Sequence, residues 1–144
     1  MNKHFPFEYP ILIYDDSCSS CYLFAKFAQT LSFGWIKIVG HFYSNESLYI
    51  RSLFFPRDYD PTIMFWLVNT NGAWGARSGL LPLSIEILTG IFKFVFKNNN
   101  TKINHKTNHE INCVNNKTSC RKPQNIFKRI LSLFKNTGKF TFND

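Results

Sequence analysis

The sequence has few cysteines, few acidic residues and no early apolar stretch of the kind that directs secretion. Four cysteines in 144 residues, unevenly placed, are too few for a secreted scaffold held by disulfides. The first residues, MNKHFPFEYP, include a proline and a glutamate where a secretory signal needs an unbroken apolar segment. We therefore expect a cytoplasmic protein, where cysteines serve catalysis or metal binding more often than structural disulfides.

Acidic residues are scarcest in the C-terminal part of the chain. Residues 1–92 contain six Lys/Arg and seven Asp/Glu, whereas residues 93–144 contain eleven Lys/Arg and two Asp/Glu. The formal charge of +8 therefore comes entirely from the C-terminal part. A hydrophobic content of 44%, with 17% aromatic residues, is enough to fill the core of one domain, which excludes disorder throughout the chain.

Apolar patterns between residues 9 and 97 predict alternating strands and helices. Short β-branched runs indicate strands, apolar residues spaced by about 3.6 indicate helices, and Asn69-Thr70-Asn71-Gly72 is a turn signal between two of the strands. The predicted strands are 9–14, 35–39, 62–68 and about 73–77, and the predicted helices are 19–31, about 44–55 and 78–97.

This order, β-α-β-α-β-β-α, predicts an α/β fold. The helix between the first two strands makes them parallel, and the hairpin adds an antiparallel pair, so we expect a four-stranded mixed sheet with flanking helices. Residues 1–97 would form this domain. An Asn- and Lys-rich stretch over 98–122 predicts a disordered linker, and residues 123–144 predict a basic amphipathic helix and tail.

Cys18 and Cys21 form a Cys-x-x-Cys motif after the first strand, at the start of the first helix. The motif is compatible with a redox couple, half of a metal site, or two small apolar residues, and its strand-to-helix setting favours redox chemistry. At the helix N-cap, Cys18 would face the positive end of the helix dipole, which stabilises a thiolate and lowers its pKa from about 8.5. This predicts Cys18 as the attacking thiolate and Cys21, one turn further and more buried, as the resolving thiol.

Asp15 and Asp16 precede the motif directly. As carboxylates they would oppose ionisation of Cys18, but a buried one could instead accept the proton of Cys21 during resolution. A third interpretation is a solvated loop that caps the helix. The sequence leaves these three open.

The segment ILIYDDSCSSC, with a strand ending in Tyr-Asp before Cys-x-x-Cys, resembles the thioredoxin superfamily and most of all its DCC family of predicted thiol-disulfide oxidoreductases. A second match is Asp60-Pro61-Thr62, just before the third predicted strand. The resemblance, over about residues 9–96, implies a thioredoxin-like fold in which Pro61 follows a cis bond and borders the substrate groove beside the cysteines.

The resulting prediction is a thiol-disulfide oxidoreductase. It would need no cofactor beyond the redox-active disulfide Cys18–Cys21, and its partners would be a thiol or disulfide protein substrate and a reductant. The supporting site residues would be Asp15, Asp16, Asp60 and Pro61. The alternative is a non-catalytic thioredoxin-like binding module that uses its basic tail to hold a membrane surface or a macromolecular partner.

The C-terminal part offers two further candidate features. His105, His109, Cys113 and Cys120 could bind a metal, form a disulfide or exchange partner, or have no role; we predict no metal site. The helix IFKRILSLFK could pack on the domain, lie on an anionic membrane as a peripheral contact, or bind a partner. Nucleic-acid binding is not expected, because no reading module accompanies the basic charge.

Overall fold

The computed structural model describes residues 6–59, 63–97, 128, 131, 133–135 and 137–141. All statements below refer to these residues. Asp60, Pro61 and Thr62 lie outside them, as do the predicted linker and the His105, His109, Cys113 and Cys120 group.

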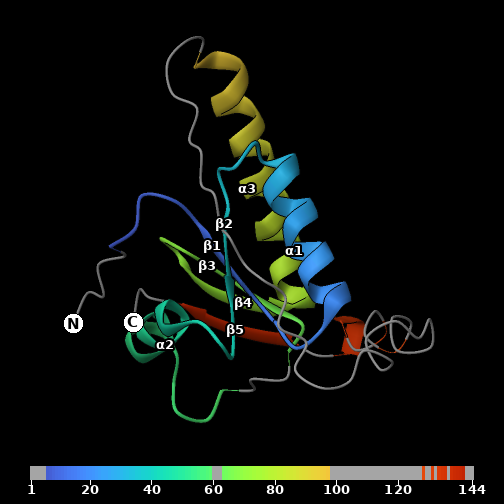
Figure 1. Cartoon of the computed structure of the whole chain (residues 1–144). Coiled ribbons are helices and arrows are strands. Elements are labelled where there is room, and N and C mark those ends of the chain that lie inside the picture. Colours follow the sequence, from blue (N-terminus) through green and yellow to red (C-terminus); the bar gives the residue numbers. More distant parts are fainter. Residues whose placement is uncertain are drawn as a thin grey trace.

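The chain forms a five-stranded mixed sheet with helices on both faces (Figure 1). The strand order is β2-β1-β3-β4-β5; β1 and β2 are parallel, and every other neighbouring pair is antiparallel. Residue 128 and several residues from 131 to 135 are also helical. The elements are β1 Ile11–Tyr14, α1 Ser19–Leu31, β2 Lys37–Gly40, α2 Asn45–Phe54, β3 Phe65–Asn69, β4 Gly72–Ala76, α3 Arg77–Phe96 and β5 Thr137–Thr141.

The predicted α/β fold with a mixed sheet is confirmed for the first seven elements. As expected for a crossover connection, α1 joins two parallel strands, with Ile11 opposite Lys37 and Tyr14 opposite Gly40. The turn between β3 and β4 forms where the sequence indicated it, because the Asn69 side chain accepts a hydrogen bond from the backbone N–H of Asn71 at 2.9 Å.

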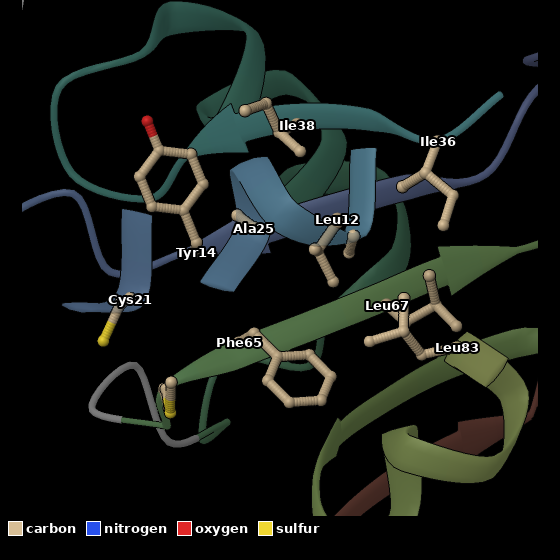
Figure 2. Packing of buried hydrophobic residues seen from close by; sticks show 11 residues of the cluster. Leu12, Tyr14, Cys21, Ala25, Ile36, Ile38, Phe65, Leu67 and Leu83 are labelled. Atoms are coloured by element: carbon tan, nitrogen blue, oxygen red, sulfur yellow. The ribbon is translucent and has the colours of Figure 1, made fainter. Parts of the chain in front are cut away.

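Alternate residues of the central strands enter two separate cores. Leu12 and Tyr14 of β1 pack with α1 and α3 on one face of the sheet, whereas Ile11 and Ile13 pack with α2 on the other. Figure 2 shows the first core, to which Cys21 belongs. The motif cysteine is therefore part of the domain's packed interior.

The fifth strand corrects the predicted four-stranded sheet. Residues 137–141, expected in the tail, pair with β4 from Gly72–Thr141 to Ala76–Thr137. Trp66 of β3 lies opposite Gly75 of β4, which lies opposite Gly138 of β5. Cβ atoms added at these glycines would lie 3.0 and 2.3 Å from the indole, so the ring lies across both. Two glycines packed against one tryptophan give no apolar strand pattern in the sequence, so the fifth strand was not predicted.

Candidate functional site

The Cys-x-x-Cys motif lies where β1 passes into α1. Cys18 occupies the N-cap of α1 in an extended conformation, and its carbonyl accepts the first helical hydrogen bond from the N–H of Tyr22 at 3.1 Å. Its own N–H donates to the carbonyl of Asp15 at 3.2 Å, which closes the loop before the helix. The strand, loop and helix thus hold Cys18 at the end of α1 where backbone N–H groups converge.

The two cysteines differ in exposure. Cys18 is half-buried, whereas Cys21 is fully buried in the core cluster that also contains Tyr14 and Phe65. The Cys18 sulfur lies 3.1 Å from the hydroxyl of Ser20, and the first turn of α1 contains no acidic residue. A reagent can therefore reach Cys18 before Cys21, and the Ser20 hydroxyl is placed to hydrogen-bond the Cys18 sulfur.

Asp15 fixes the loop that precedes the motif. The residue is 3% exposed, and its carboxylate accepts hydrogen bonds from the backbone N–H of Ser17, at 3.0 Å, and from the Ser17 hydroxyl. Its backbone N–H donates to the carbonyl of Met64 at 3.2 Å, which ties the loop to the segment before β3. These bonds lie within the loop before α1, and Asp15 is buried rather than the solvated helix cap of the third interpretation.

Asp16 connects the loop to the end of β2. Its two carboxylate oxygens accept hydrogen bonds from the backbone N–H groups of Phe42 and Tyr43, each at 2.9 Å. A Cβ at Gly40 would lie 2.4 Å from an Asp16 oxygen, so only glycine leaves room for this carboxylate. Asp16 is thus a positioning residue that holds together the carboxyl ends of the two parallel strands.

Asp60 and Pro61 lie outside the described residues, so the predicted cis bond stays a prediction. The next residues of the chain do reach the motif. Met64 belongs to the same core cluster as Cys21, and Cys18 packs against that cluster. The segment that follows Pro61 therefore lies beside the cysteines.

A hydrogen-bonded group of His41, Tyr59 and Arg51 lies next to this loop and was not predicted from the sequence. His41, 2% exposed, has its Nε2 atom 2.7 Å from the Tyr59 hydroxyl, to which Arg51 also donates at 2.9 Å. Burial lowers the pKa of His41, as does Arg51, while Asp16 and Asp15 act in the opposite direction. The only sequence signal was a histidine directly after a buried strand.

Tyr14 ends β1 beside the motif. Burial, together with the charge of Asp16 and the neighbouring Tyr22, raises the pKa of Tyr14 to about 12. Its phenol therefore stays protonated throughout the neutral range and contributes packing rather than charge. Its ring centroid lies 5.7 Å from that of Tyr22 in α1.

Within the part of the chain that the structure describes, no group of three or more His, Cys, Asp and Glu side chains is arranged to hold a metal ion. The His105, His109, Cys113 and Cys120 group lies outside that part. Comparisons of this chain with protein-family models, with curated proteins and with solved structures found no match.

Proposed function

We propose that the protein catalyses thiol-disulfide exchange with Cys18 as nucleophile and Cys21 as resolving thiol. The observation that supports this most directly is the difference between the two positions: Cys18 is half-buried at the N-cap of α1, and Cys21 is fully buried one turn further. An accessible thiolate that attacks and a protected thiol that resolves are what a two-step exchange requires.

In the first step the Cys18 thiolate attacks one sulfur of a substrate disulfide. That bond breaks, a mixed disulfide forms, and the substrate's other sulfur leaves as a thiolate that takes a proton from water. Cys21 then gives its proton to water, and its thiolate attacks the Cys18 sulfur; the Cys18–substrate bond breaks, and the second substrate sulfur leaves as a thiolate that takes up a proton. The substrate is reduced by two electrons, and the Cys18–Cys21 pair is oxidised by two. A dithiol reductant restores the pair, and the reverse sequence forms disulfides.

The assignment to a thioredoxin-like, DCC-type oxidoreductase is part of this proposal. The βαβ unit, the hairpin and α3 follow in the order that the resemblance implies, and the motif opens the first helix. In the proposal no cofactor is needed, because the Cys18–Cys21 disulfide holds both electrons. A protein thiol or disulfide is the substrate, Pro61 borders its groove, and the compartment is the reducing cytoplasm.

The test compares alkylation and turnover in a Cys113→Ser/Cys120→Ser background, so that only the motif cysteines react. Iodoacetamide should label Cys18 at neutral pH at least about tenfold faster than a free thiol such as glutathione, and Cys21 more slowly. Disulfide turnover with a dithiol reductant should fall by at least about a hundredfold in Cys18→Ser. Cys21→Ser should accumulate a mixed disulfide with the substrate.

Two results together would remove the redox assignment: Cys18 reacts no faster than glutathione, and neither serine variant changes turnover. Ser20→Ala is an informative further variant, because the Ser20 hydroxyl lies beside the Cys18 sulfur. Labelling of Cys18 should slow in Ser20→Ala, while Ser84→Ala, on the exposed side of α3, should leave it close to the wild-type rate.

A non-catalytic binding module held through the basic tail is the second candidate. Its prediction is that both serine variants bind a membrane or partner as well as the wild type does. A truncation after Lys97 would remove β5 from the sheet, so the basic tail is tested with charge substitutions such as Lys128→Gln/Lys135→Gln instead. These substitutions should weaken binding to the membrane or partner.

A further inference from the structure

Helix α3 exposes a continuous apolar stripe on the side away from the sheet. Its buried residues are Gly79, Leu83 and Gly90, which face the sheet and α1. The residues of the stripe are spaced three or four apart and are between 54% and 75% exposed. They are Leu81, Ile85, Leu88, Phe92 and Phe96.

Helix α1 adds a second stripe on the same side of the molecule. Leu23, Phe27 and Leu31 repeat every four residues and are 65%, 64% and 40% exposed. Both helices cover the same face of the sheet and lie side by side (Figure 1), so side chains that point away from the sheet share one surface. We call the two stripes together the α1/α3 apolar face.

The exposed charges on these helices are of one sign. Glu86, the one acidic residue in α1 and α3, is turned inward, where it accepts hydrogen bonds from Trp35 at 3.1 Å and Asn69 at 2.9 Å. The exposed charges are cationic: Lys26 on α1, Arg77 at the start of α3, Lys93, whose ammonium lies over the Trp35 ring, and Lys97 directly after α3. An apolar surface bordered by cations complements an anionic lipid bilayer.

Other occupants of the face fit less well. Pairing two copies through this face would bring like charges together. The following segment of the chain, from Asn98 to Asn125, has Ile103, Ile111 and Val114 as its only Leu, Ile, Val, Met or aromatic residues, which is little to cover two helices. Leu133, in the helix IFKRILSLFK, packs against the core cluster of Leu12 and Phe65, which includes no residue of the α3 stripe.

Helix α3 is also long and apolar enough to cross a membrane, with a mean hydropathy of 1.7 over an 18-residue window. Its contacts favour a position on the sheet. A Cβ at Gly90 would lie 2.4 Å from the Ser32 carbonyl oxygen, which shows how closely α3 approaches the end of α1. A crossing would break this contact and strip Glu86 of its partners.

We propose that the α1/α3 apolar face binds the surface of an anionic bilayer, with α3 lying in the plane of the interface. Phe92 and Phe96, whose rings stack with centroids 5.4 Å apart, enter the acyl boundary, and the exposed Lys26 and Lys97 contact lipid phosphates. This surface is distinct from the C-terminal basic helix that the sequence suggested for membrane contact.

The test is co-sedimentation of the full chain with vesicles of phosphatidylcholine alone and of phosphatidylcholine mixed with phosphatidylglycerol. Binding to the mixed vesicles should be at least about tenfold stronger and should weaken as salt is added. The variant Ile85→Ser/Leu88→Ser/Phe92→Ser should lose at least about tenfold in binding. A matched control on the opposite face of the sheet is Leu48→Ser/Tyr49→Ser, which replaces α2 side chains that are 55% and 57% exposed.

Lys26→Gln/Lys97→Gln keeps the apolar face and should weaken the preference for anionic vesicles. This second variant keeps the test valid if the triple variant does not fold. The proposal is overturned if the wild type sediments with neither vesicle. It is equally overturned if the α2 control loses as much binding as the α3 variant. A wild type that dimerises, does not bind vesicles and becomes monomeric in the triple variant would identify the face as an interface between copies.

Discussion

Asp16 and Gly40 depend on each other, since the carboxylate of one occupies the space that a side chain of the other would fill. Asp16→Ala should lower the free energy of unfolding by about 2 kcal/mol, because two backbone N–H groups lose their acceptor. Gly40→Ala should be destabilising in the wild type but much less so in Asp16→Ala. Urea unfolding of the four proteins in a double-mutant cycle measures the coupling, expected to exceed about 1 kcal/mol. Simple additivity would contradict the arrangement.

His41 makes stability depend on pH. Burial lowers its pKa in the folded state below the ordinary value of 6.5, so below that value the unfolded chain binds more protons. The contribution of neutral His41 to the free energy of unfolding is thus complete above about pH 6.5. It is lost as the pH falls through the folded pKa of His41. In urea unfolding at about pH 7.5 and about pH 5.5, His41→Gln should show a smaller drop in stability than the wild type. His4→Gln is the control, and an equal drop in His41→Gln would refute the assignment.

At the scale of elements, the contact between α3 and the end of α1 depends on one glycine. Alanine favours a helix over glycine by about 1 kcal/mol, yet at position 90 its Cβ would lie 2.4 Å from the Ser32 carbonyl oxygen. Because that oxygen belongs to the backbone, the helices must separate, and Gly90→Ala should lower the free energy of unfolding by about 2 kcal/mol.

The control for this change is Ser84→Ala, on the exposed side of the same helix. It should leave the free energy of unfolding within about 0.5 kcal/mol of the wild type. Thermal unfolding followed by circular dichroism measures both variants. A neutral or stabilising Gly90→Ala would show that the close approach is absent in solution.

Elements with their own periodic pattern could be predicted from the sequence. Helix α1 spans Ser19–Leu31 as predicted, because its apolar residues repeat at helical spacing and Gly34 follows. Strand β2 begins at Lys37 rather than Trp35, whose ring instead lies under the Lys93 ammonium, 3.1 Å from its centroid. The backbone N–H groups of Trp35 and Ile36 donate to Ser32, at 3.0 and 3.2 Å, so these residues belong to the turn after α1 rather than to the strand.

At the scale of the whole molecule, β5 brings the C-terminal part of the chain back to the sheet. Phe140 stacks on Trp66 with ring centroids 5.4 Å apart, and the Ser78 hydroxyl donates to the carbonyl of Gly138. Deleting residues 137–144 should lower the free energy of unfolding by at least about 2 kcal/mol. Trp66 would lose the aromatic ring that stacks on it, and β4 would lose its hydrogen-bonded neighbouring strand.

Gly138→Val tests the same contact without shortening the chain, since its Cβ would lie 2.3 Å from the indole of Trp66. Deleting residues 142–144 alone is the control and should be close to neutral. Near-ultraviolet circular dichroism and urea unfolding report both changes. If the longer deletion proves as stable as the wild type, β5 does not contribute to the folded domain.

For the candidate site, local sequence was informative about the cysteines and uninformative about their surroundings. Strand, loop and helix signals placed Cys18 at the helix start and Cys21 in the core. The same signals left Asp15 and Asp16 undecided, because their roles depend on which donors face them: the loop itself for Asp15, and the backbone after β2 for Asp16.

The sequence by itself determined the α/β order, the parallel pairing of β1 with β2, the hairpin and the position of the Cys-x-x-Cys motif, because these follow from local periodicity and chain connection. Only the tertiary structure decided that residues 137–141 join the sheet, that Asp16 holds the end of β2, and that α1 and α3 present one apolar face. Each of these depends on contacts between distant segments, whose energies arise from close packing and shared hydrogen bonds that local patterns do not encode.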